Sequence, residues 1–240
     1  IIGPNDYYQK VWQLFIKNDI FQLQKDEISI NTIKQTFLKG GYYITSLNKK
    51  LKVIVLNTVF YSTQWSQQCN TSTFYQEETQ KMSDPADQFQ WLEDTLSNIK
   101  KKNQQVYLLA HIPPGNNAYD STPLWNEEYQ LKYENITFKY KEIITMSIYG
   151  HLHSDEYRIY NNTLPALLVP SISPVFYNNP SFRHVLLNQN QYIKTYTQYY
   201  TDLSIYYARK LLNKSAVIKF QKLYNFHDVY QMEPNENPIN

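Results

Sequence analysis

Residues 147–155 read SIYGHLHSD and close an apolar run that begins at residue 143. Because β-branched and aromatic residues suit a pleated, half-buried surface, this run predicts a buried strand. Gly150 ends the strand, and His151 and His153 follow it. A glycine at a strand-to-loop junction lets the two imidazoles splay towards neighbouring points of a cleft. Since imidazole is the commonest protein ligand of zinc and similar cations, the pattern predicts metal ligands; the alternative is a solvated turn.

A second strand end that carries a histidine lies forty residues upstream of His151. Residues 104–110 predict a strand, and the loop HIPPG follows it at residues 111–115. Two prolines and a glycine fix a rigid, irregular loop, which would hold the His111 imidazole at a ligand distance. The alternative is that the prolines simply terminate the strand.

The order of the elements predicts that these two strand ends lie side by side. Helical patterns separate the apolar runs 51–58, 104–110 and 143–149, and strand–helix–strand order implies parallel pairing. Ligand sites of open α/β sheets lie beyond the carboxyl ends of the strands, so the three histidines are expected close together. Asn57 and Thr58, at the end of the first run, are further polar groups offered to such a site.

The remaining elements are predicted from apolar periodicity and turn residues. Asp84 is expected to cap a helix whose first residue is Pro85. A turn at residues 3–6 is expected before a first helix, which Asp6 could cap. The other expected elements are a short helix around Ile33, a hairpin of residues 42–47 and 51–58, a helix over 127–140, an antiparallel second sheet of residues 156–160, 166–169, 182–187 and 192–198, and a helical segment from residue 201.

The composition narrows the class of protein. The chain has 240 residues and a formal net charge of +2 without a basic block, so no nucleic-acid partner is expected. No stretch approaches about eighteen apolar residues, so no membrane span is expected. Cys69 is the only cysteine and cannot form a disulfide within these residues. The first residue is not methionine and the chain opens in an apolar run, so a fragment or a processed product is expected.

Four Asn-x-Ser/Thr sequons indicate a secreted or lumenal protein, and they stand at Asn70, Asn135, Asn161 and Asn213.

The two histidine motifs, HIPPG at 111–115 and GHLHSDEY at 150–157, resemble those of the calcineurin-like metallophosphoesterases. Within that group the chain is similar to the acid sphingomyelinase-like phosphodiesterases. Further motifs support the resemblance over most of the chain, namely GGYY at 40–43, QWL at 90–92, PSISP at 170–174, NPSFR at 179–183 and YTQYYTDL at 196–203. The resemblance implies an α/β fold, the four-layer α/β/β/α sandwich, of which residues 1–198 form the second half. Residues 199–240 would form a small helical C-terminal subdomain.

The resemblance also implies the chemistry. Two divalent metal ions, of the zinc type, would bind a phosphodiester substrate and generate a hydroxide for in-line attack. His111 and His153 would be ligands of one ion and His151 of the other. The substrate would be sphingomyelin, a nucleotide or a related phosphodiester, and the loop from Tyr119 to Trp125 could shape its rim. The compartment would be extracellular, lysosomal or another endomembrane lumen.

The chain departs from the family pattern near its first residue. The family motif Gly-Asn-His-Asp/Glu reads Gly3-Pro4-Asn5-Asp6, so Asn5 stands at the position of the histidine thought to protonate the leaving group. The Asp-x-His motif of the family has no counterpart in these residues. Two hypotheses follow. Either the missing ligands lie upstream or in other protein chains, and the protein is a hydrolase, or it is a degenerate homologue that serves as a structural or binding subunit.

Overall fold

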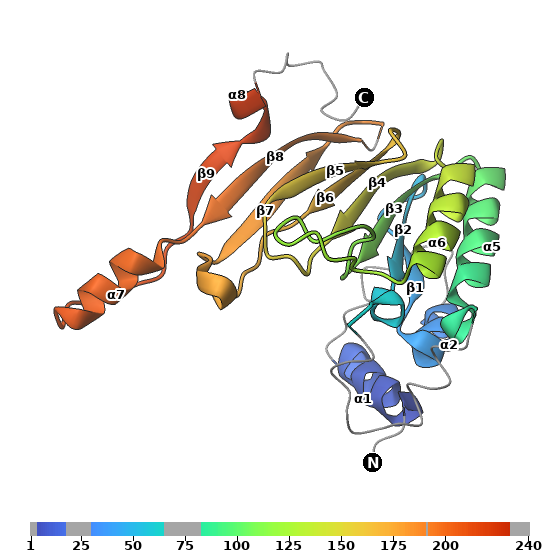
Figure 1. The fold of residues 1–240 in the computed structure, drawn as a ribbon, viewed down its shortest axis with the longest axis horizontal. Helices are drawn as coiled ribbons and strands as arrows, with labels where there is room; N and C mark the ends of the chain where they lie inside the picture. The colour runs from blue at the N-terminus through green and yellow to red at the C-terminus, as the bar shows by residue number, and fades with distance from the viewer. Residues whose placement is uncertain (1–3, 18–29, 65–82, 191, 231–240) are drawn as a thin grey trace.

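The computed structural model describes residues 4–17, 30–64, 83–190 and 192–230 of the chain. This part contains two β-sheets with helices beside them (Figure 1). The larger sheet has six strands in the order β1-β2-β3-β4-β6-β5. Its strands are β1 (Tyr43–Ser46), β2 (Leu51–Leu56), β3 (Gln105–Ala110), β4 (Ile144–Tyr149), β5 (Glu156–Tyr160) and β6 (Leu164–Leu168). Strands β2, β3, β4 and β6 run parallel, and β1 and β5 pair antiparallel at the two edges.

The smaller sheet has three antiparallel strands in the order β7-β8-β9. Its strands are β7 (Ser181–Leu187), β8 (Ile193–Tyr200) and β9 (Gln221–Asn225). The α-helices are α1 (Pro4–Lys17), α2 (Ile30–Gly40), α5 (Gln88–Lys101), α6 (Glu127–Lys139), α7 (Leu203–Leu211) and α8 (Phe226–Tyr230). The described residues also form three short 3₁₀ helices, η1 (Thr58–Tyr61), η2 (Pro85–Asp87) and η3 (Val175–Tyr177).

The two faces of the larger sheet are covered by different layers. Successive residues of a strand point to opposite faces. Ile54 and Leu108 accordingly pack in one apolar cluster with residues of α5 and α6. Val53 and Tyr107 belong to the cluster on the other face, together with Tyr196 of β8. Nearly continuous apolar strands require cover on both faces. The predicted mixed α/β fold is confirmed, and the described residues supply a helical layer, the larger sheet and the smaller sheet.

The hairpin, the parallel pairing and the helix before the third strand are found as predicted, but the start of that helix differs. Pro85 begins η2, and α5 starts three residues later. Asp84 still caps α5 across this turn, because its carboxylate accepts from the backbone N–H groups of Phe89 (2.8 Å) and Gln90 (3.0 Å). Asp84 therefore has the predicted role at a helix that begins later than predicted.

The first helix begins earlier than predicted. It starts at Pro4, so the expected turn at residues 3–6 with Asp6 as its cap is wrong. Proline suits a first helical position because its missing N–H has no intrahelical partner there, and Asp6 lies in the first turn, where a carboxylate is favourable. Helix α1 packs on α2 through Trp12 and Phe37.

Strands β5 and β6 lie in a different sheet from the one predicted. They form a hairpin, and β6 pairs parallel with β4 inside the larger sheet. The prediction that residues 156–160 and 166–169 join the second sheet is therefore wrong. Every residue of β6 is buried, as a strand with neighbours on both sides and cover on both faces requires.

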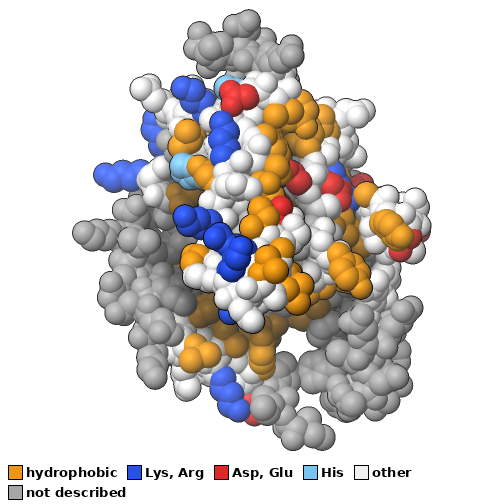
Figure 2. Space-filling model, turned by 90° about the vertical axis from the view of Figure 1, so that its left-hand side faces the viewer, with side chains coloured by type: hydrophobic (Ala, Val, Ile, Leu, Met, Phe, Trp, Pro, Cys, Tyr) orange, Lys and Arg blue, Asp and Glu red, His pale blue; other side chains and the backbone are white. Residues whose placement is uncertain are grey.

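The segment after residue 200 is not entirely helical, contrary to the prediction. Strand β9 lies between α7 and α8 and extends the smaller sheet by pairing with β8. Helix α7 extends away from the sheets and buries none of its side chains (Figure 1). Figure 2 looks onto this side and shows apolar and cationic side chains next to one another. The domain boundary at residue 198 stays a prediction.

Candidate active site

The ends of two neighbouring parallel strands bring the histidine motifs together. His111 follows β3, and His151 and His153 follow β4, its parallel neighbour. The backbone N–H of Gly150 donates to the carbonyl of His111 at 3.0 Å and ties the two strand ends to each other. The predicted proximity of the three histidines at this edge of the sheet is therefore found in the structure.

The imidazoles of His111 and His151 face each other. Nδ1 of His151 lies 3.4 Å from Nε2 of His111, and the rings cross at 78°. Two nitrogen ligands on one tetrahedral zinc ion, each 2.0–2.1 Å from the metal, lie about 3.3 Å apart. The spacing therefore fits two ligands of one ion. The resemblance pairs His111 with His153 instead, and the allocation of histidines to ions stays a prediction.

His153 has a free ring nitrogen. Its Nδ1 is buried and has no hydrogen-bond partner among the described residues. Its ring lies 5.4 Å from that of Phe176, and its backbone carbonyl accepts from Asn178 Nδ2 at 3.2 Å. Buried polar atoms nearly always have a partner, so an unpaired imidazole nitrogen beside two other histidines suits a ligand position.

The local electrostatics favour neutral imidazoles. Burial, reinforced by the nearby His153, lowers the pKa of His111. Burial also lowers the pKa of His151, and both His111 and His153 add to this effect. A metal ion requires the neutral form of a histidine ligand. Across the described ranges, however, no group of three or more His, Cys, Asp or Glu side chains is arranged to hold a metal ion.

The backbone of the second histidine motif is strained. The φ angles of His151 and His153 are +70° and +57°, in the left-handed region that non-glycine residues rarely adopt. Each such residue costs about 1–3 kcal/mol and persists only where the surrounding structure holds it. Left-handed residues on both sides of Leu152 turn the two imidazoles away from the regular alternation of an extended strand.

The first histidine motif is held by hydrogen bonds on both backbone groups of Ile112. Its N–H donates to the buried Thr58 hydroxyl at 2.9 Å, and its carbonyl accepts from Trp125 Nε1 at 3.2 Å. Trp125 is buried, so it supports the loop from beneath instead of shaping a substrate rim as predicted, whereas Tyr119 is exposed. Asn57 also differs from its expected place, because its Nδ2 donates to the Gly40 carbonyl and the Tyr8 hydroxyl, both at 2.9 Å.

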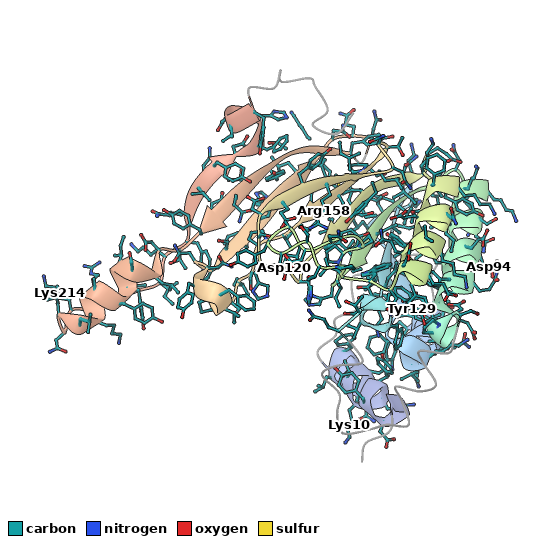
Figure 3. The ribbon with its side chains drawn as sticks, in the orientation of Figure 1. Lys10, Asp94, Asp120, Tyr129, Arg158 and Lys214 are labelled. Atoms are coloured by element: carbon teal, nitrogen blue, oxygen red, sulfur yellow. The ribbon has the colours of Figure 1, made fainter. Side chains whose placement is uncertain are left out.

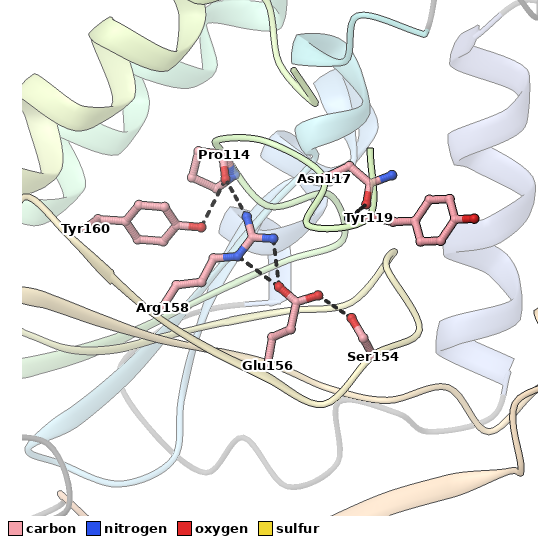
Figure 4. A network of polar contacts seen from close by, with 7 residues as sticks. All are labelled: Pro114, Asn117, Tyr119, Ser154, Glu156, Arg158 and Tyr160. Atoms are coloured by element: carbon pink, nitrogen blue, oxygen red, sulfur yellow. Dashed lines mark hydrogen bonds and ion pairs between the residues drawn. The ribbon is translucent and has the colours of Figure 1, made fainter. Parts of the chain in front are cut away.

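A polar network joins the two motifs (Figure 4). The guanidinium of Arg158 donates to Glu156 from Nη2 at 2.8 Å and to the Pro114 carbonyl from Nη1 at 3.3 Å. The Tyr160 hydroxyl donates to the same carbonyl at 3.0 Å, and the Ser154 hydroxyl donates to Glu156. Figure 3 shows Arg158 in the middle of the molecule. This network was not predicted from the sequence, although Glu156, Arg158 and Tyr160 share one face of β5 by their two-residue spacing.

The other predicted site residues are Asn5 and the four sequon asparagines. Asn5 belongs to α1. Asn135, Asn161 and Asn213 are exposed, as a sequon that carries a glycan must be. Asn70 and Cys69 lie outside the described residues. No described helix is long and apolar enough to cross a bilayer.

Fold and site together define a mixed α/β protein with imidazoles gathered beyond the carboxyl ends of parallel strands. No protein-family model matches the chain. Sphingomyelinase phosphodiesterase D of Dictyostelium discoideum is 31% identical to it over 205 residues, which is 81% of this chain and 44% of the relative. Sphingomyelin phosphodiesterase B of the same organism is 32% identical over 83% of this chain and 30% of its own length.

A mammalian relative is similar to the same extent. Cyclic GMP-AMP phosphodiesterase SMPDL3A of Rattus norvegicus is 30% identical over 78% of this chain and 42% of its own length. The chain thus spans less than half the length of these three relatives. It is a homologue of the acid sphingomyelinase-like phosphodiesterases and belongs to the family that its histidine motifs resemble.

Proposed function

We propose that the protein is a metal-dependent phosphodiester hydrolase and that this chain supplies the histidine side of its active site. The observation that carries the proposal is the pair of facing imidazoles, with 3.4 Å between a nitrogen of His111 and one of His151. The unpaired buried Nδ1 of His153 supports it as a further ligand. The two metal ions, zinc by preference, follow from the family and are part of the proposal.

The residues of this chain would act by binding and by orientation. His111, His151 and His153 would hold divalent metal, which would supply Lewis-acid chemistry for the substrate and for water. The HIPPG loop, fixed by Thr58 and Trp125, keeps the first imidazole in place and limits the ordering cost of each binding event. Sphingomyelin and a cyclic dinucleotide are the proposed substrate classes, since relatives carry both in their names.

Metal content and turnover test the proposal in the full-length protein. We expect the purified protein to contain divalent metal and to hydrolyse a chromogenic phosphodiester. The His111→Ala variant should lose metal and at least about a hundredfold in activity, because even residues that only orient ligands contribute about ten- to hundredfold. His184→Ala is the matched control, since His184 is exposed on β7. Equal metal content and activity in both variants would contradict the proposal.

A second candidate is a degenerate homologue kept as a structural or binding subunit. The observation that favours it is Asn5 at the position of the family's acid-base histidine, next to Pro4 at the position of the asparagine of the same motif. Two metal ions per protein together with turnover would refute this candidate. A protein that folds without metal and shows no turnover would support it. Ligands supplied from other chains would appear as activity recovered only in a complex.

We further propose a lumenal or extracellular location with glycans on the sequon asparagines. Support comes from the exposure of Asn135, Asn161 and Asn213. Treatment of the native protein with a peptide N-glycosidase should lower its apparent mass, and an unchanged mass would exclude glycans. The division into residues 1–198 and 199–240 is proposed as well, and limited proteolysis near residue 199 would test it.

A further inference from the structure

Asp155 connects the second histidine motif to the smaller sheet. It lies two residues after His153, in the loop that follows β4. Its Oδ1 pairs with Nη2 of Arg183 from β7, and its Oδ2 accepts from the hydroxyl of Tyr224 from β9. Both carboxylate oxygens are therefore engaged by residues of the other sheet.

Arg183 is held by the middle strand of that sheet. Its side chain is only 2% exposed. Nε of Arg183 donates to Gln198 Oε1 at 3.1 Å, and the guanidinium carbon lies 4.2 Å from the centre of the Tyr196 ring. Gln198 and Tyr196 both belong to β8, so all three strands of the smaller sheet contribute to one cluster around Asp155. A buried guanidinium such as that of Arg183 requires a negatively charged partner, and Asp155 supplies the carboxylate.

The loop that carries this aspartate is the one with two left-handed histidines. A backbone in that conformation needs to be held by its surroundings. Gly150 fixes one end of the loop through the carbonyl of His111 at 3.0 Å, and the Asn178 side chain holds the carbonyl of His153 at 3.2 Å. Asp155 fixes the other end. Contacts with the smaller sheet therefore help to hold the loop in the conformation that orients the imidazoles.

We propose that Asp155 and Arg183 are positioning residues of the metal site, which they support without ligating metal. The proposal rests on the proposed metal-binding function. Asp155 transmits the fixed geometry of the smaller sheet to the loop, and Tyr224 strengthens this connection through its hydroxyl. Loss of the connection lets the loop relax from the left-handed conformation and separates His151 and His153 from their binding positions.

Binding of Co²⁺ to the metal-depleted full-length protein tests the proposal, with affinity and visible absorption spectrum as readouts. We expect Asp155→Asn to weaken Co²⁺ binding by roughly tenfold, the low end of the loss for groups that orient metal ligands, and to alter the spectrum. Tyr224→Phe removes one hydroxyl and should give a smaller loss in the same direction. Because Arg183 acts through Asp155, the double variant Asp155→Asn/Arg183→Met should bind Co²⁺ no more weakly than Asp155→Asn.

The controls separate positioning from folding and from the proposed function. Lys222→Gln breaks the exposed Lys222–Asp228 pair of the same sheet region and should bind Co²⁺ like the parent. Circular dichroism identifies any variant that fails to fold, in which case Tyr224→Phe decides. Parent-like affinity and spectrum in folded Asp155→Asn and Tyr224→Phe variants, with binding still dependent on His111, would overturn the proposal and leave the function intact. Binding that does not depend on His111 would overturn both.

Discussion

The effect of Thr58→Val on the free energy of unfolding follows most directly from the structure. Thr58 and Ile112 are 1% and 5% exposed, and the Thr58 hydroxyl accepts the Ile112 N–H at 2.9 Å. Valine has nearly the shape of threonine but no oxygen, so packing is preserved and a buried N–H is left without its acceptor. A buried donor that loses its partner costs about 1–3 kcal/mol.

A matched variant isolates the hydrogen bond from the packing. Thr58→Ser keeps the hydroxyl and deletes one buried methyl group, which costs about 1 kcal/mol. Valine should therefore destabilise the protein at least as much as serine does, although it removes no carbon. Had the site been governed by apolar burial, valine would be the better tolerated of the two, because it buries more apolar surface.

Urea unfolding of the parent and both variants measures the difference. With an m-value of about 3 kcal/mol/M, a loss of about 1–3 kcal/mol lowers the midpoint by about 0.3–1 M. Metal affinity should fall in Thr58→Val as well, since Ile112 follows His111 directly. A midpoint equal to that of the parent, or a valine variant more stable than the serine variant, would refute the claim that Thr58 holds the HIPPG loop.

Three further substitutions test separate features of the molecule by the same unfolding assay. Leu96→Ala opens a cavity beneath α5, where Leu96 is fully buried, and should cost about 2–5 kcal/mol; a smaller loss would contradict its core position. Gly115→Ala should cost about 1–2 kcal/mol because φ is +89°, while the added Cβ would meet Arg158 Nη1 at an unstrained 3.6 Å. Lys39→Gln breaks an exposed pair with Asp87 and should change stability by less than about 1 kcal/mol; a larger change would mean that the pair is coupled to the fold.

The central strands and the meeting of the histidines could be predicted from the sequence because both depend on short-range patterns. Strands β2, β3 and β4 are apolar over nearly their whole length, which indicates burial on both faces. Helical segments between them force parallel pairing and place their carboxyl ends at one edge. Residues directly after these strands, such as His111 and His151, must then lie near one another whatever the detailed packing.

Sheet membership could not be predicted in the same way, because it depends on long-range competition. Strand β5 alternates between intermediate and exposed residues, whereas β6 is buried throughout. Either pattern suits a hairpin in an outer sheet or at the edge of a central one. Which sheet the hairpin joins depends on whether β4 offers an edge without a partner strand. In the structure β6 pairs with that edge in parallel register, with Ala166 opposite Ser147. The sequence of the hairpin does not show that this edge of β4 is available for pairing.

The orientation of the imidazoles shows a further limit of prediction from sequence. A pattern His-x-His on a regular strand sends both side chains to one face. Gly150 predicts that the two imidazoles depart from this regularity, but it does not predict the left-handed φ angles of His151 and His153, since histidine is enriched in that region and still adopts it only in a minority of cases. The signal lies instead in residues remote in sequence, Asn178 at the His153 carbonyl and Arg183 at Asp155. Both belong to the segment that leads into the smaller sheet and its first strand. The proposed support of the histidine site thus comes partly from outside its own motif, so we expect a chain that kept HIPPG and GHLHSD but lost Arg183 to keep its three histidines and to bind metal more weakly.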